Sequence, residues 1–414
     1  MHLVSESITY IFLFIALYFE VFLLITYFEL KEKERKLVAS SQYIVSRKVP
    51  SISVIVPVWN EETTVLKTVF SILKLNYPKD KLQVFIVDDG STDKTWNILQ
   101  RFARNKQVKL LKKENGGKHT ALNYALEFVD SELVGCLDAD SFVHPEALQR
   151  IVAHFEDKEM MAVTPSIILH EPKSFLQLIQ KAEYIFGIFL RKVFAYLNSI
   201  YITPGPFSIF RRSVFKQIGN YHHAHNTEDM ELAMRMQKHG MKIGNASDAF
   251  VYTVGPKNLK ALYKQRLRWV YGFMKNSIDY RDMFFKPQYG HLGMVILPAA
   301  GFSVFSTLYF FGTTILNLIN SIIIKIKEVS TVGISFGNFN FDIFYVNTDI
   351  IVFISLLAIL GTLFIIITSR KLAGEKYKLG VDSFLFMALY MMIAPFWMTK
   401  AIYNVIFSQK TKWR

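Results

Sequence analysis

The chain has 414 residues, of which 51% are hydrophobic, 15% are aromatic and only 20% are charged, and its formal net charge is +14. With a mean hydropathy of +0.23, this composition excludes a disordered chain, a fibrous repeat and a disulfide-built domain. Cys136 is the single cysteine, so no intrachain disulfide can form. The basic excess fits nucleic acid, an anionic membrane or a phosphorylated substrate, and the distribution of apolar residues decides among them.

Residues 8–28 are almost entirely apolar and long enough to cross a hydrocarbon core of about 30 Å. Four basic residues follow between positions 31 and 36, and the positive-inside rule assigns that end to the cytoplasm. We therefore expect a transmembrane helix over residues 1–30 and a basic juxtamembrane linker over residues 31–49. Glu20 within the span is expected to face other helices or to line a path for a polar product.

Three more apolar stretches lie near the C-terminus, at residues 292–324, 350–369 and 384–407. The first predicts one tilted or kinked helix, and the last is expected to be interrupted by Pro395 and Lys400. We expect about three transmembrane helices over residues 291–408, followed by a tail over 409–414. Four crossings put the basic loop at 370–378 in the cytoplasm, as the rule favours, but they put the basic tail outside, against it.

Residues 50–290 form the only segment that can make a soluble domain. Buried strands are predicted at residues 51–57, 82–87, 108–111 and 133–137, alternating with helices at 62–73, 92–104 and 118–128. This alternation predicts an α/β fold with a mostly parallel sheet covered by helices. Ligands bind outside the carboxyl ends of such strands, so the residues that follow each strand are the candidate site.

Polar and aromatic side chains follow three of the predicted strands: Trp59, Asn60, Glu61, Asp88, Asp89, Asp138 and Asp140. Any one group alone is also compatible with turn and helix-capping chemistry. Asp138 and Asp140 point to the same side because strand side chains alternate. Together with phosphate oxygens they suit Mg²⁺ or Mn²⁺. The set therefore predicts a site for a metal-bound phosphorylated ligand.

Six motifs occur in a fixed order along the chain, at residues 56–61, 87–93, 114–123, 138–140, 227–229 and 265–269. Their order and spacing resemble those of inverting family 2 glycosyltransferases with the GT-A fold, and the resemblance covers residues 54–272. The last two motifs, Thr-Glu-Asp and Gln-x-x-Arg-Trp, together with the flanking membrane helices, resemble the membrane-integrated polysaccharide synthases. Trp59 departs mildly from the pattern, because the family usually has a tyrosine there.

The resemblance implies a GT-A domain over residues 50–255 that binds a UDP-sugar. It assigns the donor to Pro57, Trp59, Glu61, Asp88, Asp89, Lys118, Asp138, Gln265 and Arg268. It further implies Mg²⁺ or Mn²⁺ on Asp138 and Asp140. Glu228 and Asp229 become the catalytic pair, with Asp229 as the general base that inverting transfer needs opposite the leaving group. The structural alternative for Asp229 is an ordinary acid at the start of a helix.

The acceptor is assigned by the same resemblance to Gly205, Phe207 and Trp269. Residues 260–276 have helical spacing that puts Gln265, Arg268 and Trp269 on one face. We expect an interfacial helix region over residues 256–290, although a basic amphipathic helix on a lipid surface explains the same pattern. The loop at 205–212 is also compatible with a structural turn. Residues 175–200 are expected at the membrane interface or packed on the membrane helices, with an ordinary core helix as the alternative.

These features indicate a multi-pass cell-membrane enzyme with a cytoplasmic catalytic domain that extends a β-linked polysaccharide. N-acetylglucosamine is the expected sugar, because Thr-Glu-Asp is closer to poly-β-1,6-N-acetylglucosamine and cellulose synthases than to hyaluronan synthases. The alternative is a non-processive enzyme with a lipid acceptor, similar to ceramide glucosyltransferase. A small accessory membrane protein or a homo-oligomer is an expected partner. Nucleic acid is not expected, because the basic residues are dispersed or juxtamembrane.

Overall fold

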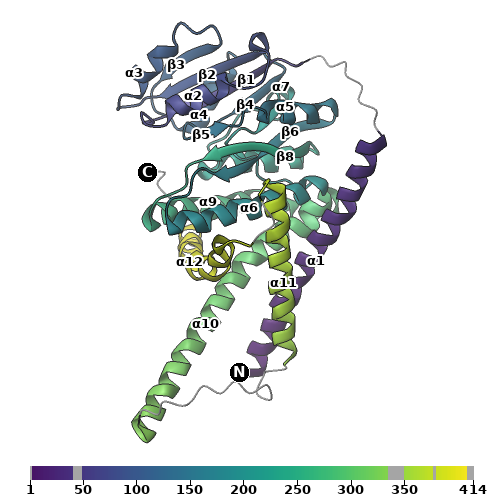
Figure 1. Cartoon of the computed structure of the whole chain (residues 1–414), viewed down its shortest axis with the longest axis vertical. Helices are drawn as coiled ribbons and strands as arrows, with labels where there is room; N and C mark the ends of the chain where they lie inside the picture. The colour runs from purple at the N-terminus through teal and green to yellow at the C-terminus, as the bar shows by residue number, and fades with distance from the viewer. Residues whose placement is uncertain (1, 41–48, 334–348, 376–378, 408–414) are drawn as a thin grey trace.

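The computed structural model describes residues 2–40, 49–333, 349–375 and 379–407. The predicted tail at 409–414, residues 41–48 of the predicted linker, and Lys376 and Lys378 of the basic loop lie outside this range. At its centre is an eight-stranded sheet in the order β3-β2-β1-β4-β7-β6-β8-β5 (Figure 1). The strands are β1 (Ile52–Val58), β2 (Leu82–Asp89), β3 (Val108–Lys113), β4 (Leu133–Cys136), β5 (Ser141–Val143), β6 (Met160–Leu169), β7 (Ile209–Arg211) and β8 (Lys242–Thr253).

The first four strands are parallel neighbours and confirm the predicted α/β fold class. They alternate with α2 (Val65–Leu73), α3 (Thr95–Leu99) and α4 (Lys118–Leu126). Alternate side chains of β1 and β2 enter two separate hydrophobic clusters, one on each face of the sheet. A strand buried on both faces is a nearly continuous apolar run, which is why these strands were readable in the sequence.

The second half of the sheet was not predicted. β7 runs antiparallel to both β4 and β6, β5 runs antiparallel to β8, and β6 pairs with β8 in parallel. β5 and β7 are only three residues long, too short to show a period in the sequence. Three helices complete this half: α5 (Ala147–Ala153), α7 (Arg212–Ile218) and α8 (Glu228–Lys238).

Two long helices, α6 (Phe175–Tyr196) and α9 (Leu259–Asp279), lie between the sheet and the elongated helices below it (Figure 1). α6 begins at a capping box in which Ser174 and Gln177 satisfy each other's backbone N–H groups. Phe189 and Val193 of α6 are fully buried against residues of α1 (His2–Ser40) and α11 (Ile350–Leu372). The prediction that this segment packs on the membrane helices is therefore confirmed.

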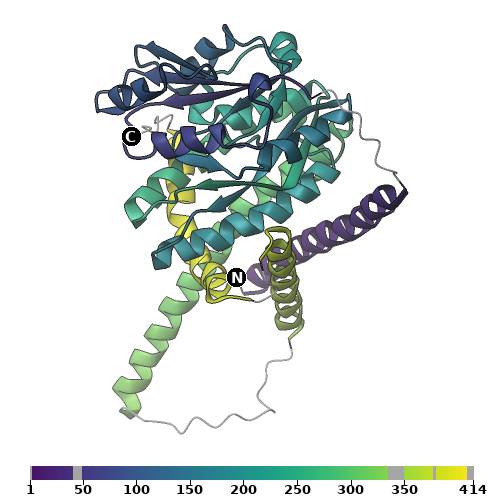
Figure 2. The same ribbon diagram turned by 45° about the horizontal axis from the view of Figure 1, so that its top comes forward.

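Among the described residues, four helices are long and apolar enough to span a membrane, over Ser7–Glu32, Leu292–Thr331, Ile350–Leu372 and Val381–Ile406. Figures 1 and 2 show α10 (Leu297–Val332) and α11 extending away from the sheet on the side of α6. The predicted interruption of the last span is wrong, because α12 (Val381–Ile406) continues through Pro395 and Lys400. A membrane helix tolerates proline where its neighbours satisfy the freed backbone groups. Glu20 faces α11, where its Oε1 accepts a hydrogen bond of 2.5 Å from Thr362.

Candidate active site

The carboxyl ends of β1, β2 and β4 meet at one edge of the sheet. Val58, at the end of β1, lies opposite Asp88 of β2, and Ile55 lies opposite Cys136 of β4. The residues that follow these strands are therefore neighbours, as the sequence predicted from parallel pairing. Electrostatic repulsion between Asp140 and Glu61 indicates that the segments after β4 and β1 converge.

Asp89 is held by donors from its own chain. Its carboxylate accepts hydrogen bonds from Lys113 Nζ at 2.7 Å, from the Gly117 N–H at 2.8 Å and from the Gly116 N–H at 3.1 Å. Gly117 has a φ of +91°, a conformation that side chains rarely adopt. The glycine pair thus lets the loop turn its amides onto Asp89 and fixes this carboxylate before any ligand arrives.

Asp88 differs from its neighbour because half of its carboxylate lacks a partner. The residue is 0% exposed, and its Oδ1 accepts a 3.2 Å bond from the Ser91 N–H. Its Oδ2 has no hydrogen-bond donor among the described residues. A buried carboxylate oxygen without a donor is costly, so this position is suited to receive an N–H or O–H group from a ligand.

The loop after β1 is fixed to the neighbouring loop. The Glu61 N–H donates to Thr95 Oγ1 at 2.9 Å, and Glu61 Oε2 accepts from Thr64 at 2.6 Å. Trp59 is half-buried where this loop leaves the strand, whereas Pro57 is buried within β1 itself. The side chains of Trp59 and Glu61 thus lie at the sheet edge, and Pro57 shapes the strand that carries them.

Lys118 connects three motifs that are far apart in the sequence. It is the first residue of α4, and its Nζ lies 2.7 Å from Asp138 Oδ1 and 3.3 Å from Glu228 Oε1. Burial acts to lower the pKa of Lys118, but the two carboxylates outweigh it and raise the pKa well above its ordinary value. The ammonium group is therefore a permanent positive charge between Asp138 and Glu228.

Asp138 and Asp140 form the most crowded part of the edge. Burial, together with the charges of Asp138 and Glu61, raises the pKa of Asp140 to about 6, and a hydrogen bond from Ser141 opposes the rise. Such an excess of carboxylate oxygens fits a hard divalent cation. No three His, Cys, Asp or Glu side chains within the described part of the chain are grouped to hold a metal.

Asp229 lies in the first turn of α8, next to this cluster. Burial raises its pKa to about 6, and Glu228 adds to the effect, whereas Lys118 and Arg268 oppose it. The Met230 N–H donates to Asp229 Oδ1 at 2.9 Å. Asp229 thus lies at the start of a helix, as the structural alternative expects, and a carboxylate with a pKa near 6 has the acid strength that a general base near neutral pH needs.

The loop before β7 crosses directly over the carboxylate cluster. A Cβ placed on Gly205 would lie 2.6 Å from Lys118 Nζ and 3.0 Å from both Asp138 oxygens. Only glycine lets the backbone approach this closely. Phe207, by contrast, is 0% exposed in the hydrophobic core, and its N–H donates to the Cys136 carbonyl. The structure therefore brings Gly205 to the site but not the side chain of Phe207.

The Gln-x-x-Arg-Trp motif lies in the middle of α9. Arg268 Nη1 donates to the Asn226 carbonyl at 2.8 Å, and its charge acts on Asp229. Gln265 and Trp269 are instead grouped around Arg266, which donates to Gln265 Oε1 at 2.9 Å and lies 4.1 Å from the centre of the Trp269 ring. Arg268 thus faces the carboxylates, and Trp269 is held by a cation–π contact.

Sequence reasoning missed Arg266, which joins α9 to two other helices. It is 2% exposed and donates to Glu183 of α6 at 2.5 Å, and Tyr390 of α12 donates to the same Glu183 at 3.0 Å. The lone acid at position 183 within an apolar run was the available signal. The contact fixes the helix that carries Trp269 against a candidate membrane span.

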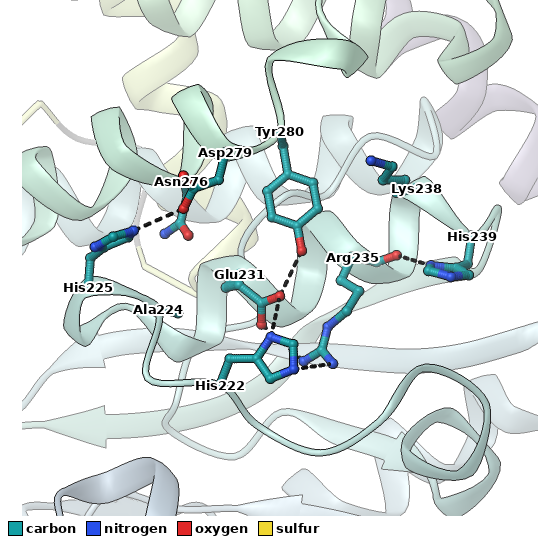
Figure 3. Close-up of a pocket in the computed structure, with 10 residues that line it drawn as sticks. All are labelled: His222, Ala224, His225, Glu231, Arg235, Lys238, His239, Asn276, Asp279 and Tyr280. Atoms are coloured by element: carbon teal, nitrogen blue, oxygen red, sulfur yellow. Dashed lines mark hydrogen bonds and ion pairs between the residues drawn. The ribbon is translucent and has the colours of Figure 1, made fainter.

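A cavity of about 540 Å³ is lined by residues of α8, of α9 and of the loop before α8, and the lining includes none of the predicted site residues (Figure 3). It is bordered by His222, which contacts both Glu231 and Arg235 at 3.2 Å. The loop that closes it has three successive residues with positive φ, namely Ala224, His225 and Asn226. Strain of this kind persists only where the surroundings hold the backbone. The strained segment ends two residues before Glu228, close to the start of α8.

The chain matches the family described as glycosyltransferase like family 2 over residues 50–272, more than half of its length. It is 32% identical over 254 residues to poly-beta-1,6-N-acetyl-D-glucosamine synthase of Staphylococcus epidermidis, covering 60% of each chain. It is 29% identical to beta-monoglucosyldiacylglycerol synthase of a Nostoc species, covering 62% of this chain and 58% of that relative. The matches thus span about 60% of the length of these relatives.

Among solved structures, a mannosyltransferase of Pyrobaculum calidifontis in complex with GDP-Man and Mn²⁺ superposes with a TM-score of 0.58. The superposition covers 95% of this chain and 99% of that one at 18% identity, so the two share a fold. The sheet order, the matched segment and the curated relatives agree. The chain belongs to glycosyltransferase family 2.

Proposed function

We propose that this protein is an inverting transferase that adds N-acetylglucosamine from a UDP-sugar to a growing β-linked polysaccharide at the membrane. The observation that carries the proposal is the position of Lys118 between Asp138 and Glu228. This contact joins the motif expected to hold a diphosphate to the motif expected to hold the base. Repulsion among the surrounding acids favours the binding of a cation and the uptake of a proton.

The donor is proposed to bind along β1 and β2. The unpartnered Asp88 Oδ2 is an acceptor for the imide N–H of uracil. Asp89 is already bonded to Lys113 and to the glycine amides, so it presents a fixed edge to the ribose. Trp59 and Glu61 close the other side of this position.

Asp138 and Asp140 would hold Mg²⁺ or Mn²⁺, together with oxygens of the diphosphate. When bound, the metal would neutralise the charge of the leaving UDP. The Mn²⁺ in the related mannosyltransferase complex supports a divalent ion. Lys118 and Arg268 are the cations of the chain itself near this position, and Arg268 can bind phosphate oxygens through two N–H groups.

Asp229 is proposed to take the proton from the acceptor hydroxyl. The acceptor oxygen then forms a bond to the anomeric carbon while the bond between that carbon and the UDP oxygen breaks, which inverts the configuration. The proton resides on Asp229, and the electron pair leaves with UDP. A base whose pKa lies near 6 is deprotonated at neutral pH and remains basic enough to assist the step.

The acceptor is proposed to lie across Trp269 and the Gly205 backbone. The relative from Staphylococcus epidermidis supports N-acetylglucosamine and a polysaccharide product. A lipid acceptor is the second candidate, and the relative from the Nostoc species, a glycolipid synthase by name, favours it. A small accessory membrane protein or a homo-oligomer remains part of the proposal for the polysaccharide.

The catalytic domain is proposed to lie in the cytoplasm of a multi-pass membrane protein. The support is the four candidate membrane spans and the basic residues that follow the first of them. This arrangement puts the domain on the side where nucleotide sugars are made.

The proposal is tested with the full chain in lipid vesicles, supplied with Mg²⁺ or Mn²⁺ and a panel of UDP-sugars. UDP release and product size are measured, with Asp229→Asn as the inactive reference. UDP release with UDP-N-acetylglucosamine and a ladder of long products is expected. A single lipid-linked sugar would establish the second candidate, and release no greater than that of the variant with every donor would contradict both.

A further inference from the structure

One face of α9 packs directly on the loop that leads into α8. Arg268, Gly272 and Asn276 are spaced four residues apart, so they lie on one face of the helix. Arg268 donates to the Asn226 carbonyl at 2.8 Å. A Cβ placed on Gly272 would collide with the side chain of Thr227. The absence of a side chain at position 272 thus lets the loop lie against the helix.

Asn276 holds the last residue of this loop. It is 0% exposed, and its Nδ2 donates to Thr227 Oγ1 at 2.8 Å. The same hydroxyl of Thr227 donates to the Ala224 carbonyl at 3.0 Å. A threonine before a helix usually accepts a hydrogen bond from the backbone of the first turn, but the side chain of Thr227 makes no such bond. Its hydroxyl therefore fastens the loop to α9 instead of capping α8.

The loop needs support from outside because its backbone is strained. Ala224, His225 and Asn226 have φ values of +42°, +54° and +62°, and such strain persists only where neighbouring groups hold the backbone. A bond of 2.9 Å between His225 and Asp279 also joins the loop to α9 (Figure 3). Both of these side chains are partly exposed, and a surface pair of this kind contributes little. The buried contacts are therefore the main support of the loop.

α9 is itself anchored on its opposite side. Arg266 lies two residues before Arg268 and so points to the other side of the helix. It donates to Glu183 of α6, and Tyr390 of α12 donates to the same carboxylate. The helix is thus fixed between α6 and α12 on one side and the loop on the other. It can therefore serve as a rigid support for the start of α8.

Asn276 carries a cost that its packing does not offset. Its Oδ1 is closed off from solvent and has no hydrogen-bond donor among the described residues. A buried polar atom without a partner is unfavourable, and a leucine, which has nearly the same shape, would avoid the cost. Stability alone therefore does not account for an asparagine at this position, whereas the contact with Thr227, two residues before Asp229, does.

We infer that Asn276 is a positioning residue for the transfer reaction: through Thr227 it fixes the start of α8 and thereby the direction of the Asp229 carboxylate. The inference rests on the proposed function, in which Asp229 takes the proton of the acceptor. Asp229 is also held through its carbonyl, which accepts from the Thr203 hydroxyl at 2.9 Å. Loss of the Asn276 contact should therefore weaken the transfer step without abolishing it.

The experiment uses the full chain in nanodiscs. Asn276→Leu removes the donor to Thr227 with little change in side-chain shape. Ser277→Ala is the matched control, because it removes a buried polar atom without a partner among the described residues from the next position of the helix. The measurements are kcat and the donor KM from UDP release, hydrogen exchange of the peptide at residues 224–231, and the unfolding temperature.

Asn276→Leu is expected to lower kcat about tenfold, as the loss of one buried hydrogen bond predicts, and to speed hydrogen exchange in residues 224–231. The donor KM should change by less than about twofold, because the lost contact does not involve the donor. The unfolding temperature should not fall. Ser277→Ala should match the wild type in every measurement. In a Thr227→Val background, Asn276→Leu should cause no further loss of kcat, because the contact is already absent.

An Asn276→Leu enzyme with wild-type kcat or unchanged hydrogen exchange would overturn the inference. A lower unfolding temperature with kcat and KM changed together would assign Asn276 a purely structural role. If Asn276→Leu fails to fold, Gly272→Ala displaces Thr227 by another route and should lower kcat in the same way.

The proposed function and the inference fail in different ways. No UDP release by the wild type with any donor would refute the proposed function, and the role of Asn276 in it. An active wild type with an unaffected Asn276→Leu variant would refute the inference alone. Hydrogen exchange and the unfolding temperature need no turnover, so they report on the contact with Thr227 in either case.

Discussion

The two halves of the same sheet edge hold their carboxylates in opposite ways. At the end of β2, Asp89 receives hydrogen bonds from a lysine and two backbone amides. At the end of β4 and the start of α8, Asp138 and Glu228 share Lys118, while burial and neighbouring acids raise the pKa values of Asp140 and Asp229. The first half is the part proposed for recognition of the donor, and the second keeps repulsion that a cation and a proton can relieve.

The two halves differ in what they cost the protein: rearrangement on ligand binding in the first, and stability of the folded state in the second. The β2 half is complete apart from one oxygen of Asp88, so ligand binding there requires little rearrangement. The other half is less stable than the same fold without its acids would be, because like charges are kept together in a partly buried place. Stability given up at a reactive site is a common trade in enzymes. Substitutions on the two halves should therefore differ in which property they change.

The largest expected effect is on Asp229. Asp229→Asn should lower kcat by about 10³-fold because the amide cannot take the acceptor proton, while the KM for the donor changes little. Steady-state UDP release measures both constants. Asp279→Asn, an acid on α9 that contacts His225 rather than the cluster, is the control and should stay near wild type. An Asp229→Asn enzyme with more than a tenth of wild-type kcat would refute the assignment of the base.

The second largest effect is expected for the substitution of Lys118. Lys118→Gln removes the one cation that Asp138 and Glu228 share, so the neighbouring acids should hold protons more tightly and kcat at neutral pH should fall about 10²-fold. Because the loss arises partly from protonation, activity should recover in part as the pH is raised. A loss of equal size at every pH would show that Lys118 contacts the substrate and does not set the protonation of the acids.

Asp88 tests the recognition half. Asp88→Ala removes the acceptor proposed for the base of the nucleotide, so the donor KM and the inhibition constant of UDP should rise about tenfold, with kcat within a few-fold of wild type. Competitive inhibition by UDP measures the change. A fall in kcat with unchanged KM would place Asp88 in the chemical step. It would contradict the proposed division of the sheet edge into a recognition half and a reactive half.

The smallest effect is a gain in stability. The raised pKa of Asp140 means that the folded state binds a proton more readily than the unfolded state, so its contribution to stability falls as the pH rises from about 4 to 6 and stays low above that. Asp140→Asn should thus stabilise the protein by about 1 kcal/mol at pH 7 in metal-free buffer. Asp157→Asn should not stabilise, because a hydrogen bond from Lys242 lowers the pKa of Asp157. Unfolding temperatures in nanodiscs measure both variants.

The sequence was sufficient for those parts of the molecule whose signals are local. β1, β2 and β4 are continuous apolar runs, and the acids that follow them meet because parallel strands end at the same edge. The membrane spans follow from length and hydropathy. The motifs identified the family because their residues keep a fixed order, which is confirmed by the matched segment at 50–272.

What sequence reasoning missed depends on contacts between distant segments. The Arg266–Glu183–Tyr390 connection joins three helices, and nothing in any one of them specifies the other two. Phe207 was assigned to the acceptor by the resemblance of its loop to the family's small-residue loop, yet its side chain is buried in the hydrophobic core. The three-residue strands β5 and β7 exist only because longer strands hold them.

The pH dependence of kcat/KM tests the central claim most directly, because the crowded half of the edge is defined by raised pKa values. Asp229 must be deprotonated to act, so activity should be constant above its pKa of about 6 and fall about tenfold for each pH unit below it. The measurement uses the full chain in vesicles with saturating acceptor. Lys118→Gln should shift the acid side of the profile, where activity falls, to higher pH. A profile that stays flat between pH 5 and 8 would contradict the account.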